Sequence, residues 1–533
     1  MAHPLSPSSL PQGKTRRRTH NPPAIIVIAS VLIAAALLLP LIYLVVRATG
    51  ASGGLLRFVL RPQTVNVLFN TLGLALSVTL AALGIALPVA FLTLRTNVPG
   101  RHIWFVLCSL PLVIPTYVGA FVMISAFATG GLLSSWLAIS FPSIYGFGGT
   151  MLVLTLFSYP YMLLALRAGL RGLDPSLEEA SRSLGHSAWG TFFRVSLPHL
   201  RPAIAAGSLL VALYVMSDFG AVAMLRYNSF TRAIFVQYQN SFNRSNAAAL
   251  GLILVLLIAL VLAVDYLLRG RRRLERTGSG AARKAALIDL GPWRYVAMLP
   301  LLLLVLLALV APLSVIVAWL WRGIANNVPI AIEWRALWNT VSVSLLAALA
   351  STLAAIPIAV LSVRFPSRLS VLLERLSYVG YALPGVVVAL TLVFFGARYV
   401  PWIYQTRTLL VIGYVILFIP QAVGNIRARL LQISPSLEES ARSLGRTPTR
   451  VLLEVTFPLL RSGLLTGAAL VFLTTMKELP ATLLLGPTGF HTLATRIWMW
   501  TSEAFYAQAA PSALLLVLAS SLSVGLILWQ ERD

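Results

Sequence analysis

Long apolar segments separated by short polar ones dominate the pattern of this 533-residue chain. Each segment has about 20 residues or more, enough for a helix to cross ~30 Å of hydrocarbon at 1.5 Å per residue. Six of them precede a basic stretch at residues 269–292, and six follow it. The pattern predicts twelve membrane-spanning helices, near residues 24–46, 68–94, 103–128, 149–168, 203–225, 247–268, 295–321, 338–363, 371–397, 407–426, 463–486 and 508–529.

The composition indicates an all-α polytopic membrane protein. Hydrophobic residues make up 58% of the chain, charged residues only 11%, and the mean hydropathy is +0.85. The net charge of +25 does not indicate a nucleic-acid partner, because the basic residues fall between apolar segments, where they set membrane topology. The single cysteine, Cys108, excludes an intramolecular disulfide and a cysteine cluster for a metal.

The distribution of basic residues predicts the orientation in the membrane. If the N-terminus is cytoplasmic, most of the 41 lysines and arginines lie in segments on the cytoplasmic side. Residues 1–23 then form a basic, disordered cytoplasmic tail, and the first apolar segment is a retained span because no A-x-A-like cleavage site follows it. We predict a multi-pass protein of a bacterial cytoplasmic (inner) membrane with both termini cytoplasmic.

The two halves of the chain repeat one another. Residues 68–95 match residues 337–364, and PSLEEASRSLG at 175–185 matches PSLEESARSLG at 435–445. Each half has an even number of spans, so both halves cross the membrane in the same sense. The predicted domains are a first six-helix repeat at 24–268, a basic cytoplasmic linker at 269–292 and a second repeat at 293–533, with charged loops near 171–201 and 431–461.

Each charged loop is predicted to begin with a short helix. Asp174 and Ser434 are good helix caps followed by a proline suited to the first helical position, although an S-x-x-E capping box starting at Ser176 or Ser436 is an alternative. The glycine that ends each motif is expected to end the helix. A second amphipathic piece then runs to a proline, so each loop offers a docking surface for a partner.

The two loops resemble a known motif. The pattern E-A-A-x3-G-x9-I-x-L-P marks the membrane subunits of binding-protein-dependent ABC importers, and both copies here keep the spacing from glycine to proline. Serine replaces one alanine in each copy, and the isoleucine is valine. The predicted coupling residues are Glu178, Glu179, Ala180, Ser181, Gly185 and Pro198 in the first copy, and Glu438, Glu439, Ser440, Ala441, Gly445 and Pro458 in the second.

The resemblance implies a fused permease with separate partners. Each motif would be a coupling helix seated on an ATPase subunit, so two ATPase copies are expected, together with an extracytoplasmic substrate-binding protein. ATP and Mg²⁺ would be used by the ATPase; this chain is expected to bind no cofactor and to be no enzyme. The sequence also lacks the G-x-x-x-x-G-K-[ST] loop that binds the phosphates of ATP. Only Lys14 follows a glycine, and Ser8 stands where the first glycine of the loop is required.

The prediction of the cargo is based on less specific sequence features. Asp218 and Glu478 fall at equivalent positions at the ends of the fifth and eleventh spans, where two carboxylates could line a cation path. Alternatively, Glu478 pairs with Lys477 and Asp218 lies in the outer interface near Arg226. The phrases SDFG and KELPATLLL resemble the ferric-iron branch of these importers, which implies iron as the cargo.

Other cargoes and another class remain alternatives. Thiamine, polyamine, phosphonate and sulfate-like importers share much of this architecture, and a twelve-helix secondary transporter is the alternative from a different class. The six histidines are scattered along the chain, so no resident metal site is predicted.

Overall fold

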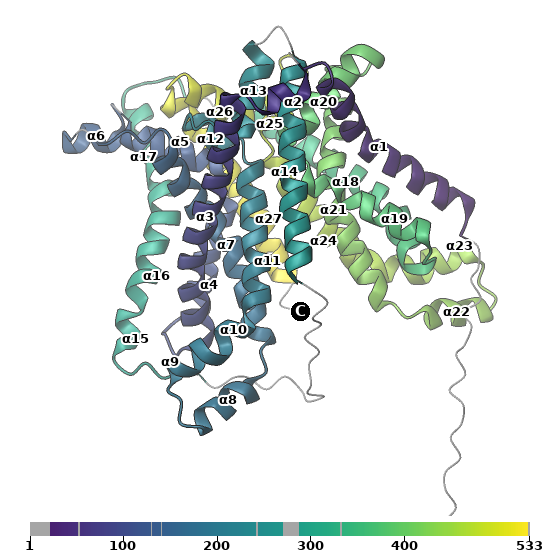
Figure 1. The fold of residues 1–533 in the computed structure, drawn as a ribbon, viewed down its shortest axis with the longest axis horizontal. Coiled ribbons are helices and arrows are strands. Elements are labelled where there is room, and N and C mark those ends of the chain that lie inside the picture. The colour runs from purple at the N-terminus through teal and green to yellow at the C-terminus, as the bar shows by residue number, and fades with distance from the viewer. Residues whose placement is uncertain are drawn as a thin grey trace, which may run out of the picture.

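The computed structural model describes residues 22–51, 54–128, 130–139, 141–240, 244–269, 287–330 and 333–530. Nearly all of the predicted basic tail and most of the predicted linker lie outside these residues. The described part is helical, and its one isolated β-bridge joins Thr96 to Ile288. Figure 1 shows two bundles of helices that meet at one end and separate toward the other.

The first half contains sixteen elements in the order of the chain. They are α1 (Ala24–Ala48), α2 (Leu55–Val59), α3 (Pro62–Arg95), α4 (Arg101–Ser109), η1 (Leu110–Val113), α5 (Thr116–Phe127), α6 (Leu132–Leu137), α7 (Phe147–Gly172), α8 (Pro175–Ser183), α9 (Ala188–Thr191), η2 (Phe192–Ser196), α10 (Leu197–His199), α11 (Arg201–Ser217), α12 (Gly220–Met224), α13 (Phe230–Asn240) and α14 (Ser245–Arg269).

The second half repeats this order without counterparts of α2 and α6. Its first span is divided into four elements, and a single helix stands where the first half has α10 and α11. Its elements are α15 (Trp293–Val296), α16 (Met298–Val305), η3 (Leu306–Val310), α17 (Ala311–Ala325), α18 (Trp334–Arg364), α19 (Arg368–Ser377), η4 (Tyr378–Ala382), α20 (Gly385–Tyr399), α21 (Arg407–Gln432), α22 (Pro435–Ser443), α23 (Pro448–Val451), η5 (Leu452–Thr456), α24 (Phe457–Met476), α25 (Pro480–Leu485), α26 (Leu493–Ser502) and α27 (Tyr506–Gln530).

Nine helices in the described ranges are long and apolar enough to cross a membrane, or up to eleven if each of two bent pairs is one span. These correspond to the first eleven predicted spans. The twelfth falls on α27, whose described apolar part, Tyr506–Ser521, is shorter. The fold class predicted from the hydrophobic pattern, an all-α polytopic protein in two repeats, is confirmed.

The prediction of continuous helices at 103–128 and 371–397 is wrong. Each of these spans breaks just before a proline, at Ile114 and Leu383, where the backbone is extended (ψ 117° and 112°). A residue before proline is pushed out of the helical region by the proline ring, so the chain must turn there. In the second half the two pieces meet at an angle of 104°.

The first helix of each half packs against the other half. α1 lies along α14 of its own half but also contacts α18, α19 and α20, and Tyr43 packs edge-on against Phe395 with ring centroids 6.0 Å apart. In the same way α16 contacts α4, and α17 contacts both α27 and α5. Figure 1 shows α1 beside the green helices of the second half and α15 to α17 beside the first. The hydrophobic pattern does not predict this exchange.

Small side chains line the inner faces of the long central helices. In α3 the buried positions include Ala75, Val78, Ala82 and Ala86, spaced by three or four residues, and α3 packs against α7. The outer faces of α3 and α18 carry exposed leucines instead, which suits contact with lipid tails. Since lipid is as apolar as leucine, close packing of small residues is what holds such helices together.

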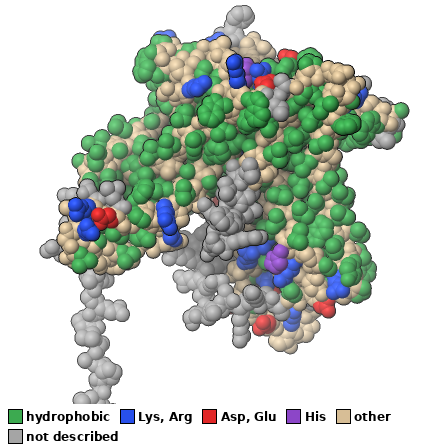
Figure 2. Space-filling view, turned by 180° about the vertical axis from the view of Figure 1, so that it is seen from behind, with side chains coloured by type: hydrophobic (Ala, Val, Ile, Leu, Met, Phe, Trp, Pro, Cys, Tyr) green, Lys and Arg blue, Asp and Glu red, His purple; other side chains and the backbone are tan. Residues whose placement is uncertain are grey.

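The two halves meet at one end through equivalent contacts. α5 packs against α26 and α27, while α20 packs against α13 and α14. The rings of Phe219 and Trp498 lie 5.2 Å apart across this boundary. At the other end, which carries α8 and α22 and is called the motif end below, the halves stand apart (Figure 1). Figure 2 shows hydrophobic side chains across the middle of the molecule and charged ones toward its two ends.

Candidate functional site

Both motif helices start as the cap residues predict. The Asp174 carboxylate accepts a hydrogen bond from the Ser176 amide at 3.0 Å, and the Ser434 hydroxyl accepts one from the Ser436 amide at 3.3 Å. Proline occupies the first helical position in α8 and α22. The alternative capping box starting at Ser176 or Ser436 is therefore wrong, because each helix already begins one residue earlier.

The glycines end the motif helices as predicted. Gly185 and Gly445 have φ of +85° and +81°, in the left-handed region that side-chain-bearing residues avoid. A Cβ atom at either position would meet nothing within 4 Å, so only the backbone conformation requires glycine.

This geometry predicts a local effect of Gly185→Ala. The left-handed conformation costs an L-residue about 1 kcal/mol or more, so we expect the end of α8 to open several-fold more often. Trypsin cleavage after Arg182 in membrane vesicles measures this opening. Gly172→Ala is the matched control, since Gly172 lies in α7 and is equally uncrowded; equal cleavage of both variants would contradict the expectation.

The two adjacent glutamates of each motif point in different directions. Glu178 is turned toward the bundle, where its Oε1 lies 3.2 Å from Arg95 Nη2 and accepts a hydrogen bond from the Ser196 hydroxyl at 2.8 Å. In the second half, Glu438 Oε1 lies 2.8 Å from Arg364 Nη2, and the Thr456 hydroxyl donates to it at 3.2 Å. Both acids are thus anchors rather than free docking groups.

The arginines extend these anchors to the ends of the spans. Arg95 Nη2 also donates to the Leu170 carbonyl at 3.0 Å, and Arg364 donates to the Ile433 carbonyl at 3.3 Å. Each arginine side chain therefore ties a motif helix to two spans, α3 and α7 or α18 and α21. We call each arginine with its glutamate a strut. The sequence alignment of the two halves paired Arg95 with Arg364 but did not identify them as functional residues. Each lies at the end of a repeated segment, and that shared position could have marked them.

The outward face of each motif helix remains available. The exposed residues there include Glu179, Ala180, Glu439 and Ser440, and a leucine next to each glycine is unusually open: Leu184 is 79% and Leu444 84% exposed. Ser181 and Ala441 are turned inward instead, and the Ser181 hydroxyl lies 3.1 Å from that of Thr191. These exposed side chains are the part of each motif helix that another protein could reach.

The prolines lie at the same place in both motif copies, and backbone hydrogen bonding accounts for the turn before each of them. Pro198 and Pro458 each come two residues after a π-helical turn, η2 and η5. Proline has no N–H to donate to the preceding turn, and a wider turn lets the freed carbonyls find donors further along. In the first half the helix also bends by 62° at Leu200, where the loop joins the span α11.

The end of the linker is attached beside the first strut. The Ile288 amide donates to the Arg95 carbonyl at 2.8 Å, and the Asn97 amide donates back to the Ile288 carbonyl at 3.2 Å. Asp289 accepts from the Gly291 amide at 2.9 Å and from the Asn97 side chain at 2.5 Å. These two hydrogen bonds hold the pKa of Asp289 below its ordinary value. The second half thus begins against the motif end of the first.

The two candidate cargo carboxylates lie at equivalent helix breaks between the halves. Asp218 ends α11 and Glu478 follows α24, and both are half-buried. Each accepts a hydrogen bond from the backbone amide three residues on, Ala221 at 3.0 Å and Ala481 at 3.2 Å, so each caps a short following helix. With the proline breaks of α5 and α20, four interrupted spans converge here, and we call this region the seam.

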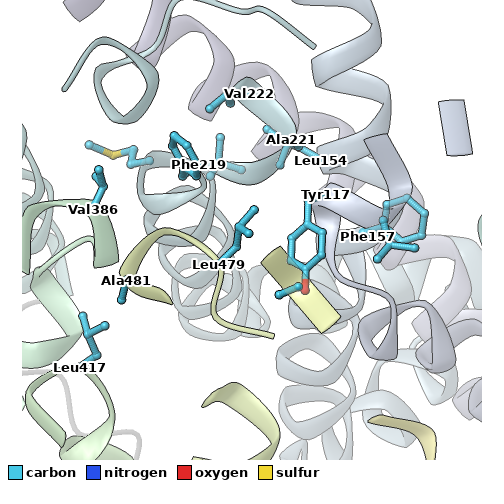
Figure 3. Close-up of a cluster of buried hydrophobic side chains, with 14 of the residues drawn as sticks. Tyr117, Leu154, Phe157, Phe219, Ala221, Val222, Val386, Leu417, Leu479 and Ala481 are labelled. Atoms are coloured by element: carbon cyan, nitrogen blue, oxygen red, sulfur yellow. The ribbon is translucent and has the colours of Figure 1, made fainter. Parts of the chain in front are cut away.

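Figure 3 shows the buried side chains around the seam, with Tyr117, Phe219, Val386 and Leu479 from the four interrupted spans in one cluster. The hydroxyl of Tyr117 is buried there without a hydrogen-bond partner. Interrupted helices expose backbone groups and helix ends inside the membrane, which is where transport proteins commonly hold their cargo. The seam is therefore the region of the fold best suited to contact a cargo.

The two carboxylates differ in how well they are held. Asp218 also accepts a hydrogen bond from the Thr116 hydroxyl, whereas Gly385 occupies the equivalent position in the second half. A Cβ atom on Gly385 would lie 2.3 Å from Glu478 Oε1, so glycine leaves the room that this carboxylate fills. Glu478 is consequently the less constrained of the two acids.

The alternative pairing of Glu478 with Lys477 is not found, and Arg226, near which Asp218 was alternatively expected to lie, has an aromatic partner. Lys477 Nζ donates to the Leu112 carbonyl at 3.0 Å instead of pairing with Glu478, and the Arg226 guanidinium lies over the Tyr145 ring, 4.9 Å from its centre. Among the residues that the structure describes, no three of histidine, cysteine, aspartate and glutamate gather as a metal site would require.

An all-α bundle of two repeats, with interrupted spans at its centre and a short motif helix under each half, defines a polytopic membrane permease. Residues 82–274 and 351–532 match the family described as binding-protein-dependent transport system inner membrane component, and the chain belongs to this family of ABC importer permeases.

Three relatives show which permeases of this family the chain is similar to. It is 36% identical to the Fe(3+)-transport system permease protein FbpB 2 of Haemophilus influenzae, over 92% of this chain and 95% of the relative. It is 26% identical to the ferric transport system permease protein FbpB of Actinobacillus pleuropneumoniae, over 78% of this chain and 64% of the relative. A molybdenum transport system permease protein, ModB of Escherichia coli, is 30% identical over 38% of this chain but 94% of its own length. One repeat here thus corresponds to a whole chain there.

Proposed function

We propose that this permease carries ferric iron into the cytoplasm, driven by two separate ATPase subunits docked on α8 and α22. Each ATPase would receive an exposed leucine and glutamate, Leu184 with Glu179 or Leu444 with Glu439. ATP and Mg²⁺ are used by these partners, and this chain binds no cofactor. The observation that carries the proposal is the pair of equivalent docking helices, each fixed to its spans by a strut.

The proposed orientation places the motif end in the cytoplasm of a bacterium. The basic residues that flank this end support it, since they favour the inner side of the membrane. The opposite end would then receive a cargo-loaded extracytoplasmic binding protein. The halves stand apart at the motif end and meet at the other, which suits a cargo-free permease open to the cytoplasm. ATP-driven approach of the two ATPases would bring α8 and α22 together and open the opposite end.

The choice of iron depends on the relatives and on the seam. Two of the relatives described above are ferric transport permeases, and the seam offers carboxylates, the hard oxygen ligands that ferric iron prefers. The scattered histidines and the absence of a gathered ligand set among the described residues fit a path that passes the ion on rather than storing it.

Cargo-stimulated ATP hydrolysis tests this proposal. The permease is reconstituted in lipid with its ATPase and given binding proteins loaded with ferric iron, molybdate, sulfate, thiamine or a polyamine in turn. We expect stimulation by the ferric-loaded protein alone, because productive docking is coupled to the cargo the system carries. The ATPase without permease is the control. Stimulation by another cargo would exclude iron but keep the importer, and no stimulation by any of them would overturn the ATPase coupling.

A further inference from the structure

One charged side chain at the seam has no part in the function proposed above. Lys477 follows α24 in the second half, and its Nζ donates a hydrogen bond to the Leu112 carbonyl in η1 of the first half, 3.0 Å away. The lysine is half-buried and lies directly beside Glu478 in the chain. The bond therefore joins the two halves at the level of the interrupted spans.

The Leu112 carbonyl is available because of the proline break. Its normal partner in a 3₁₀ turn would be the amide of residue 115, but Pro115 has no N–H. Ile114 is extended, so the helix does not continue past it. A backbone carbonyl at membrane depth needs a donor, since lipid offers none, and the lysine of the other half supplies it.

This contact has no twin in the other half. The two motif copies are 260 residues apart, so the position equivalent to Lys477 is Ser217. The proline breaks, Pro115 and Pro384, are 269 residues apart, so the carbonyl equivalent to Leu112 belongs to Tyr381. A serine hydroxyl is several atoms shorter than a lysine side chain. Although the fold is two-fold related, this bond between the halves therefore depends on a single side chain.

We propose that Lys477 is a latch that keeps the seam closed until a loaded binding protein arrives. The inference depends on the proposed importer cycle, in which the halves move apart at the end opposite the motifs. That movement requires Lys477 to leave the Leu112 carbonyl. A closed seam also blocks the path along which small cations could leak. Lys477 is thus a positioning residue that acts on the equilibrium between closed and open seam.

Substitution of Lys477 in the complete complex of permease, ATPase and binding protein tests the latch. We expect Lys477→Met to raise ATP hydrolysis in the absence of cargo about tenfold, because a hydrogen bond from a charged group is worth enough to shift a two-state equilibrium by that factor. The same variant should let protons leak through proteoliposomes without ATP, as read by an internal pH dye. Lys477→Arg keeps the charge and the donor and should behave as wild type.

Two further variants keep the test decisive. Lys477→Gln is a second neutral variant, used if the methionine variant does not reach the membrane, with the same expectation of raised basal hydrolysis. Ser217→Ala is the matched control at the equivalent position and should change nothing. Basal hydrolysis at the wild-type level in the neutral variants, or an equal rise in Ser217→Ala, would overturn the latch. If wild type itself shows no cargo-stimulated hydrolysis, the importer cycle has failed instead.

Discussion

Replacing Glu178 or Glu438 with alanine is expected to abolish most transport while leaving the protein in the membrane. Each substitution leaves an arginine, Arg95 or Arg364, with its side chain only 7% or 14% exposed and without its acid. Removing one member of a buried ion pair costs about 3 kcal/mol. We expect α8 or α22 to detach from its spans, so that ATP hydrolysis no longer moves them. Cargo uptake in vesicles, compared with ATPase co-purification, measures the effect.

The neighbouring glutamates provide the contrast. Glu179→Lys and Glu439→Lys change exposed side chains, so they should leave the helices in place and weaken ATPase association instead. Replacing Arg95 and Glu178 together by methionine should recover much of the local stability, because a buried pair can often be exchanged for apolar residues. If Glu178→Ala transports as well as wild type, the strut has no role in coupling.

Neutralising both seam carboxylates, with Asp218→Asn and Glu478→Gln, should lower cargo transport more than tenfold with little effect on ATPase binding. Glutamine can still cap α25 through its oxygen, as Glu478 does with the Ala481 amide, and asparagine can do the same for α12. The double variant therefore loses the two negative charges but keeps these hydrogen bonds. Charged groups inside a membrane are energetically costly, so their presence indicates a functional role. Uptake of ferric iron by the reconstituted complex is the measurement.

Thr116→Val separates charge from structure at this site. It removes the hydroxyl that donates to Asp218 but keeps the carboxylate. If the path needs the charge, this variant transports at close to the wild-type rate while the double variant does not. If Thr116→Val is as defective as the double variant, the carboxylate serves to hold the break between α11 and α12 rather than to meet the cargo. We expect Glu478→Gln to be the more harmful single change, because Glu478 is the less constrained acid.

Local signals in the sequence predicted much of this molecule. Apolar length alone located the spans, because a helix must cross a fixed thickness of hydrocarbon. Cap chemistry predicted where α8 and α22 begin, and the glycines predicted where they end, since both effects act within one helical turn. The repeat predicted that what holds for one half holds for the other.

What the sequence did not reveal depends on contacts between distant residues. Glu178 and Glu179 are identical in type, and only the position of Arg95, 83 residues earlier, decides which of them is an anchor. The pairing of Lys477 with a backbone carbonyl cannot be read from residue types, because every residue offers a carbonyl. The prolines that follow Ile114 and Leu383 could have predicted the helix breaks there. The breaks were missed because the hydrophobic segments continue through them without interruption.

The exchanged first helices carry a consequence for the history and the assembly of this chain. The first helix of each repeat buries part of its surface against the other repeat, so it is fully packed only when both repeats are present. This arrangement is the one expected of a dimer of two separate, identical chains. The covalent connection is therefore not what unites the halves, and two polypeptides divided within residues 270–286 are expected to find each other when co-expressed.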